Sequence, residues 1–128
     1  MNYYISRHVH GEFGAVMEKL NTLLREEGFA VKTEIDVTAT LRDKLGVDYK
    51  KYHILGACNP GYAYEALQAE DKIGVLLPCN VILIEQEPGL IEVAAMDAAA
   101  MMTGMGNPVL AGVAARVNQH LQKVVEAV

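Results

Sequence analysis

The sequence predicts an α+β fold: a two-layer sandwich in which helices pack on a mostly antiparallel five-stranded sheet. Segments of strand and helical periodicity follow one another in the order strand, helix, strand, helix, strand, helix, hairpin, helix. A Pro-Gly turn at 87–89 between two apolar strands marks the hairpin. The length of 128 residues fits one domain, 1–128, whose core is large enough to form without a disulfide or a metal.

The first half of the chain carries clear start and stop signals. Gly28 is placed to end a helix whose apolar side chains recur at helical spacing. Asp36 is a candidate N-cap for a short helix, and Gly46 is placed to close it. The elements expected here are a strand at 3–6, a turn at 8–11, a helix at 13–24, a strand at 29–35 and a helix at 37–45.

The second half repeats one capping signal. Asn59-Pro60 and Asn107-Pro108 each combine an N-cap residue with a proline at the first helical position. The expected elements are strands at 52–57, 73–85 and 90–95, helices after each Asn-Pro pair, and a loop or short helical turn at 96–106. The first six elements of the chain suggest a ferredoxin-like arrangement.

The strand expected at 73–85 is apolar on both of its alternating faces. A strand in a simple two-layer protein should show one polar side. We therefore expect a helix to cover one face and a second copy of the chain to cover the other, which predicts a homodimer.

Composition and charge exclude several classes of partner. The net charge of −5 provides no basic surface for nucleic acid. The first ten residues do not resemble a signal peptide, and the longest apolar run, 75–84, is too short to cross a bilayer. We expect a cytoplasmic protein with reduced cysteines that binds neither nucleic acid nor membrane.

Two similar segments contain both cysteines and form the candidate site. Cys58 is followed by Asn59 at the start of a helix, where the helix dipole favours a thiolate. Cys79 lies between Pro78 and Asn80 in the next strand. If the two strands are neighbours, both sulfurs can reach one pocket. The candidate ligand-binding residues are Cys58, Asn59, Pro78, Cys79, Asn80 and His53, and Cys58 and Cys79 are also the candidate catalytic residues.

Metal binding stays an alternative at this stage. The cysteine spacing matches no zinc pattern, whereas two thiols in one pocket suit a soft metal such as Cu(I). Four methionines within ten residues, Met96, Met101, Met102 and Met105, are either soft ligands or adaptable packing at a groove or interface. The sequence does not identify a cofactor.

Several pieces of the chain are distinctive. They are HILGACNP, EALQ, IGVLLPCNV, the Glu-Pro-Gly turn, Asp97 with methionines after it, and Gly-Asn-Pro before the last helix. Together they resemble domain-of-unknown-function family 302 (DUF302). The resemblance runs from about residue 13 to residue 128. It implies a compact α+β fold that tends to form homodimers, and it implies no established reaction. Ala98 departs from the family, which usually has proline there, so we expect a looser turn before the methionines.

Three functions remain open from the sequence. The first is a homodimeric domain that binds a small ligand or a soft metal around the two cysteines. The second is a thiol-dependent redox enzyme or sulfur carrier that uses Cys58 and Cys79. The third is a structural or interaction module whose cysteines fill the core.

Overall fold

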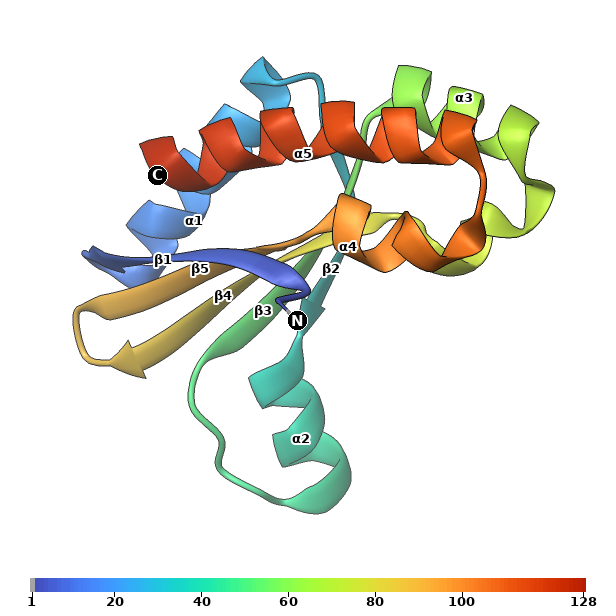
Figure 1. The fold of residues 1–128 in the computed structure, drawn as a ribbon. Helices are drawn as coiled ribbons and strands as arrows, with labels where there is room; N and C mark the ends of the chain where they lie inside the picture. The colour runs from blue at the N-terminus through green and yellow to red at the C-terminus, as the bar shows by residue number, and fades with distance from the viewer. Residues whose placement is uncertain (1) are drawn as a thin grey trace.

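The computed structural model describes residues 2–128, and its centre is one five-stranded sheet in the order β1-β5-β4-β3-β2. Every neighbouring pair of strands is antiparallel. The two edge strands, β1 and β2, therefore come from the first 36 residues, and the β4–β5 hairpin lies between β1 and β3 (Figure 1). The strands are β1 (Tyr4–His10), β2 (Ala30–Asp36), β3 (Tyr52–Cys58), β4 (Cys79–Glu87) and β5 (Leu90–Met96).

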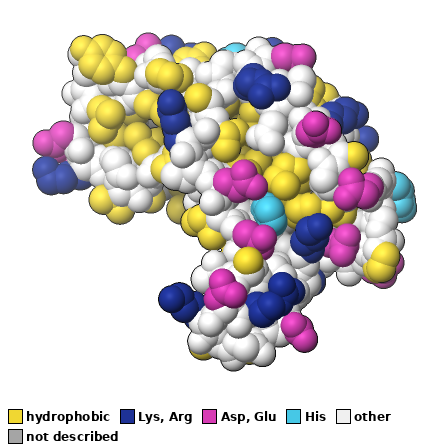
Figure 2. Space-filling model, turned by 180° about the vertical axis from the view of Figure 1, so that it is seen from behind, with side chains coloured by type: hydrophobic (Ala, Val, Ile, Leu, Met, Phe, Trp, Pro, Cys, Tyr) yellow, Lys and Arg dark blue, Asp and Glu magenta, His cyan; other side chains and the backbone are white. Residues whose placement is uncertain are grey.

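The long helices pack on one face of this sheet, whereas α2 projects beyond the ends of β2 and β3, the two strands that it connects (Figure 1). Seen from behind, α2 forms a separate lobe that carries many of the charged side chains in this view (Figure 2). No helix in the described part of the chain is both long and apolar enough to cross a membrane. The helices are α1 (Phe13–Glu26), α2 (Val37–Leu45), α3 (Pro60–Ala69), α4 (Ala98–Met102) and α5 (Pro108–Ala127), with 3-10 turns η1 (Asp71–Leu76) and η2 (Thr103–Met105).

The predicted α+β two-layer class is confirmed, and its core lies between the sheet and the helices. Leu55, Val81 and Leu83 point from the central strands toward the helices and are fully buried. The whole predicted stripe of the last helix is buried: Leu110, Val113, Ala114, Val117, Leu121, Val124, Val125 and Val128. Burial of apolar side chains at helical spacing on α5 and at alternate positions on β4 is the main source of stability for this arrangement.

Most of the predicted caps are present. The Asp36 side chain accepts a hydrogen bond from the Ala39 N–H, and Gly46 adopts a left-handed conformation with φ of 64°. The Asn107 side chain caps α5 in the same way. Asn59 precedes α3 but makes no cap, because its amide donates to the carbonyl of Glu27 at 3.4 Å.

Three sequence expectations were wrong. His8 and His10 belong to β1, not to a turn, because β1 pairs with β5 along its whole length. The strand expected at 73–85 begins only at Cys79; the preceding residues form η1 and a cis Leu77-Pro78 bond. The ferredoxin-like arrangement is absent, since its split βαβ unit would place a single strand between β1 and β2, whereas these two strands form opposite edges of the described sheet.

The turn before the methionines is held by hydrogen bonds. The Asp97 carboxylate accepts from the Ala100 N–H at 2.9 Å, and the Ala98 N–H donates to Asn118 Oδ1 at 2.7 Å. Asn118 in turn donates to Asp97 at 2.7 Å. The looser turn expected from Ala98 is therefore not found, because α5 supplies an acceptor for an N–H that proline would lack.

Candidate functional site

The two cysteine segments line a small cavity between the end of the sheet and helices α3 and α5. Its volume is about 30 Å³, which is the space of one water molecule. Of the sequence candidates, Cys58, Asn59, Pro78 and Cys79 contribute to its wall. The other lining residues are almost all apolar and include Phe29, Ala63, Ala66, Leu77, Met102, Val113 and Val117. The cavity is too small for an organic ligand.

The cysteines do not form a cross-strand pair. Cys79 is opposite Ala57 in the ladder, and Cys58 lies one position further along, at the last residue of β3. Both are free thiols, Cys58 half-buried and Cys79 buried. Burial, helped by the nearby Cys58, raises the pKa of Cys79 to about 11. Cys79 is therefore a neutral thiol at neutral pH, which suits packing better than nucleophilic or metal-binding chemistry.

The remaining sequence candidates lie elsewhere. Asn80 faces the opposite side of the sheet from Cys79, as the alternation along β4 requires. His53 is buried toward the other end of β3, with Nδ1 3.2 Å from Glu34 and Nε2 3.4 Å from Asp36. Its ring packs edge-on against Phe13. The structure thus separates His53 and Asn80 from the cysteine cavity.

Thiol labelling of the folded protein should distinguish the two cysteines. We expect 5,5′-dithiobis(2-nitrobenzoate) to modify Cys58 alone at neutral pH, because Cys79 is buried and protonated. Cys79 should react only after unfolding in guanidinium, and a Cys58→Ser variant should release no thionitrobenzoate while folded. Equal rates for both thiols in the native protein would show that the cavity opens to reagents.

The methionine cluster is divided between two environments. Met102 is buried against the cysteine cavity, whereas Met96 and Met101 lie on the other side of the sheet. Met105 is exposed. No group of three or more His, Cys, Asp or Glu side chains in the part of the chain that the structure describes could hold a metal ion. Nothing in the geometry favours a shared methionine site.

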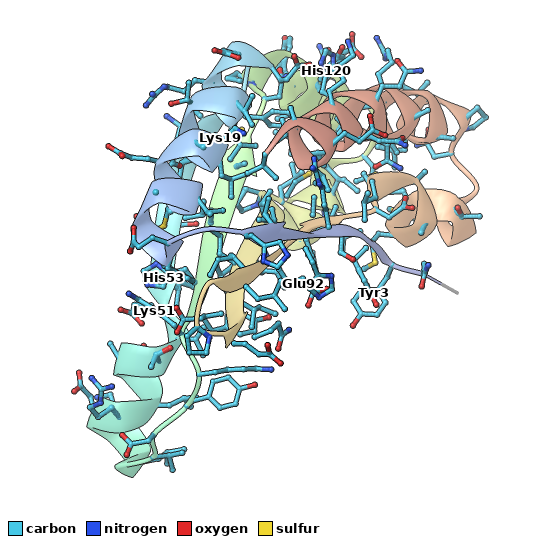
Figure 3. All side chains as sticks on the ribbon, turned by 90° about the vertical axis from the view of Figure 1, so that its left-hand side faces the viewer. Tyr3, Lys19, Lys51, His53, Glu92 and His120 are labelled. Atoms are coloured by element: carbon cyan, nitrogen blue, oxygen red, sulfur yellow. The ribbon has the colours of Figure 1, made fainter. Side chains whose placement is uncertain are left out.

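A much larger hollow lies on the face of the sheet that no long helix covers, here called the open-face groove. Its volume is about 480 Å³, within the range of small-molecule sites. Tyr3 and Glu92 lie on this side of the strands, with His120 far from them among the helices (Figure 3). Ile82, Ile84, Ala94 and Met96 form the floor of the groove, Tyr3, Tyr4, Tyr52 and Met101 form its sides, and Asn80 and Glu92 are its polar groups.

The polar end of the open-face groove is organised by hydrogen bonds. The Gln86 amide N–H donates to Glu92 Oε1 at 2.8 Å, and Lys50 Nζ donates to Gln86 Oε1 at 3.0 Å. Burial raises the pKa of Tyr52, with smaller contributions from Tyr49, Tyr3 and Glu92. Tyr52 therefore keeps its hydroxyl proton and can donate a hydrogen bond to a ligand.

Comparison with known proteins places this fold in a family. The family model described as "Domain of unknown function DUF302" matches residues 5–128. The chain belongs to this family. A solved structure of an uncharacterised conserved DUF302 protein from Bacillus stearothermophilus is 27% identical, with a TM-score of 0.90 over 98% of each chain. No curated protein matches the chain significantly. The resemblance to DUF302 noted in the sequence is thus confirmed, and it brings no established activity.

Most of the open-face groove leaves no pattern in the sequence. Ile82 and Ile84 indicate a second apolar face of the strand, and from the sequence alone this face predicts a dimer contact. Tyr3, Tyr52 and Glu92 come from three segments far apart in the chain, and only the strand order brings them together. Alternation within each strand identifies which side a residue faces, but not which strands are neighbours.

Proposed function

We propose that this chain binds a small, largely apolar molecule in the open-face groove. The observation that carries the proposal is the volume of about 480 Å³ on a sheet face without a long covering helix. Pockets of this size, lined by apolar and aromatic side chains with a few polar groups, are typical binding sites. We also propose that residues 1–128 form a single domain and that the protein is cytoplasmic.

The lining defines the chemistry of the ligand. Ile82, Ala94 and Met96 provide an apolar floor, and the tyrosine rings provide flat walls for an aromatic or alicyclic body. Glu92 accepts a hydrogen bond from Gln86 through Oε1, so its second oxygen is available to a donor on the ligand. The expected ligand is an apolar molecule with one N–H or O–H group, neutral or cationic rather than anionic.

The cysteine cavity supports a binding function less well. Its volume of about 30 Å³ and apolar walls leave room for little more than a water molecule. The pKa of about 11 keeps Cys79 protonated, so a soft metal would have to displace its proton in an apolar environment. Of the residues predicted to bind ligand, Asn80 alone lines the open-face groove.

The proposal is tested with N-phenyl-1-naphthylamine, a neutral apolar amine whose fluorescence rises in apolar sites. We expect one molecule to bind per chain, and an Ile82→Lys substitution to weaken binding at least about tenfold, because it places a charge on the groove floor. Val75→Lys is the matched control, since Val75 is 86% exposed and lies outside the groove. Equal binding by wild type and both variants, or none by wild type, would contradict the proposal.

A second candidate function is assembly of a homodimer through the same face. The observation that favours it is β4, whose Ile82 and Ile84 are apolar on the side away from the helices. Pairing of two such faces would bury them as in a sandwich of sheets. Native mass spectrometry at the concentrations of the fluorescence titration separates the candidates. A dimer that becomes a monomer on Ile82→Lys and binds no probe supports assembly alone, whereas probe binding by a monomer supports the ligand site alone.

A further inference from the structure

Three side chains from different helical segments meet at a distance from the open-face groove. Glu27 follows α1, Tyr62 lies in the first turn of α3, and His120 lies on α5. Glu27 Oε1 is 2.7 Å from His120 Nδ1, and the Tyr62 hydroxyl oxygen is 3.1 Å from His120 Nε2. One imidazole therefore connects a carboxylate to a phenol. His120 is labelled at the top of the helical layer in Figure 3.

The two hydrogen bonds define the role of each nitrogen. Glu27 accepts a hydrogen bond from Nδ1–H, and this fixes the tautomer in which Nε2 carries a lone pair. That lone pair faces the Tyr62 hydroxyl and can accept its proton. A hydroxyl, a base within hydrogen-bond reach and a third group that orients the base together form the signature of an activated nucleophile.

We propose that Glu27, His120 and Tyr62 form an activating triad in which the Tyr62 hydroxyl attacks small acyl donors. The side chains of His120 and Glu27 are 29% and 25% exposed, so reagents can reach the triad. The Tyr62 ring also lines the cysteine cavity, which places the phenol beside the Cys58-Asn59 segment. This inference is independent of the open-face groove, and neither depends on the other.

The charges around Tyr62 favour this chemistry. The Arg116 guanidinium lies 5.3 Å from the centre of the Tyr62 ring and also bonds to Glu65 at 2.6 Å. A cation over the ring stabilises the phenolate character that Tyr62 gains as its proton moves to His120. Glu27, on the far side of the imidazole, stabilises the imidazolium that forms when His120 takes the proton.

The reaction can be written for 4-nitrophenyl acetate, a simple acyl donor. The Tyr62 oxygen forms a bond to the carbonyl carbon while its proton moves to His120 Nε2. The bond between the acyl carbon and the leaving oxygen then breaks, and 4-nitrophenolate departs with the bonding electrons. Acetyl-Tyr62 is the product, and His120 returns its proton to solvent.

The experiment treats the full chain with 4-nitrophenyl acetate and locates the acetyl groups by fragmentation mass spectrometry. Tyr64 is the internal control, because it lies on the same helix and is 64% exposed. We expect Tyr62 to be acetylated at least about tenfold faster than Tyr64, as a positioned general base contributes at least this much. His120→Gln should lower the Tyr62 rate to that of Tyr64, and Glu27→Gln should lower it by a smaller factor.

A merely structural role for the three side chains predicts a different result. Hydrogen bonds that only join the helices would leave the ratio of the Tyr62 and Tyr64 rates near or below one in the wild type. That ratio, or a Tyr62 rate unchanged in folded His120→Gln protein, would overturn the proposal. Circular dichroism reports whether each variant is folded. If His120→Gln does not fold, the Glu27→Gln variant provides the test. An acetylation rate of Tyr62 that is unchanged in that variant would also contradict the proposal.

Discussion

Replacement of Leu83 by alanine is expected to lower the free energy of unfolding by about 2–5 kcal/mol. Leu83 is fully buried on the helix side of β4, the strand between β3 and β5. Removal of its isobutyl group loses transfer free energy and leaves a cavity between the sheet and the helices. This loss is a large fraction of the stability of a typical domain, about 5–15 kcal/mol, so the transition should shift far toward lower urea concentration.

Ile82→Ala is the matched control for this prediction. Ile82 is the residue directly before Leu83 on the same strand, so its side chain faces the open-face groove, and it is only half-buried. Its truncation should cost about 1 kcal/mol, because less apolar surface returns to water. Urea unfolding of both variants at one protein concentration measures the difference. Equal losses would mean that both faces of β4 are covered in solution, and a loss at Ile82 that grows with protein concentration would point to a dimer.

Gly56→Ala is the second substitution with a large expected effect. A Cβ atom at Gly56 would lie 2.1 Å from Thr33 Oγ1 and 2.8 Å from Pro78 Cγ. The Thr33 hydroxyl can rotate, but the proline ring cannot move without shifting the start of β4. We expect a loss of about 2–3 kcal/mol, as for other overpacked sites. The substitution should also displace Cys79, which follows Pro78, and so should expose that thiol to labelling.

Gly112→Ala provides the control for a glycine without close neighbours. Gly112 lies within α5, and a Cβ atom there would meet nothing within 4 Å. Alanine is a better helix former, so this variant should gain about 1 kcal/mol. Thermal unfolding of the two variants should therefore shift in opposite directions. A Gly56→Ala protein as stable as the wild type would show that Thr33 and Pro78 do not lie this close to Gly56 in solution.

Local signals predicted the parts of the fold that local interactions determine. The Asp36 cap, the Gly46 closure and the buried stripe of α5 each depend on residues within a turn or two of one another. The start of β4 could not be predicted in this way, because the apolar run before Cys79 fits a strand or a helix equally well. Asn59 also escaped prediction, since its amide donates to a carbonyl 32 residues earlier in the chain.

For the candidate sites, too, the sequence predicts what depends on nearby residues and not what depends on distant ones. The sequence indicates Cys58 and Cys79 as site candidates, and the adjacent strands β3 and β4 place both against one cavity. The size of that cavity depends on how α3 and α5 pack over it, and no sequence pattern reports this. The open-face groove and the Tyr62–His120 contact both join segments that are far apart in sequence, so they follow only from the tertiary structure.

The most direct test of the proposed binding site is a titration of ¹⁵N-labelled protein with N-phenyl-1-naphthylamine, followed by amide chemical shifts. The account predicts that the shifts concentrate on the strands under the open-face groove, at Asn80, Ile82 and Ala94, while the amides of Cys58 and Asn59 stay unchanged. Shifts centred on Cys58 and Asn59, with the amides of Ile82 and Ala94 unchanged, would contradict the proposed site and would indicate binding at the cysteine cavity.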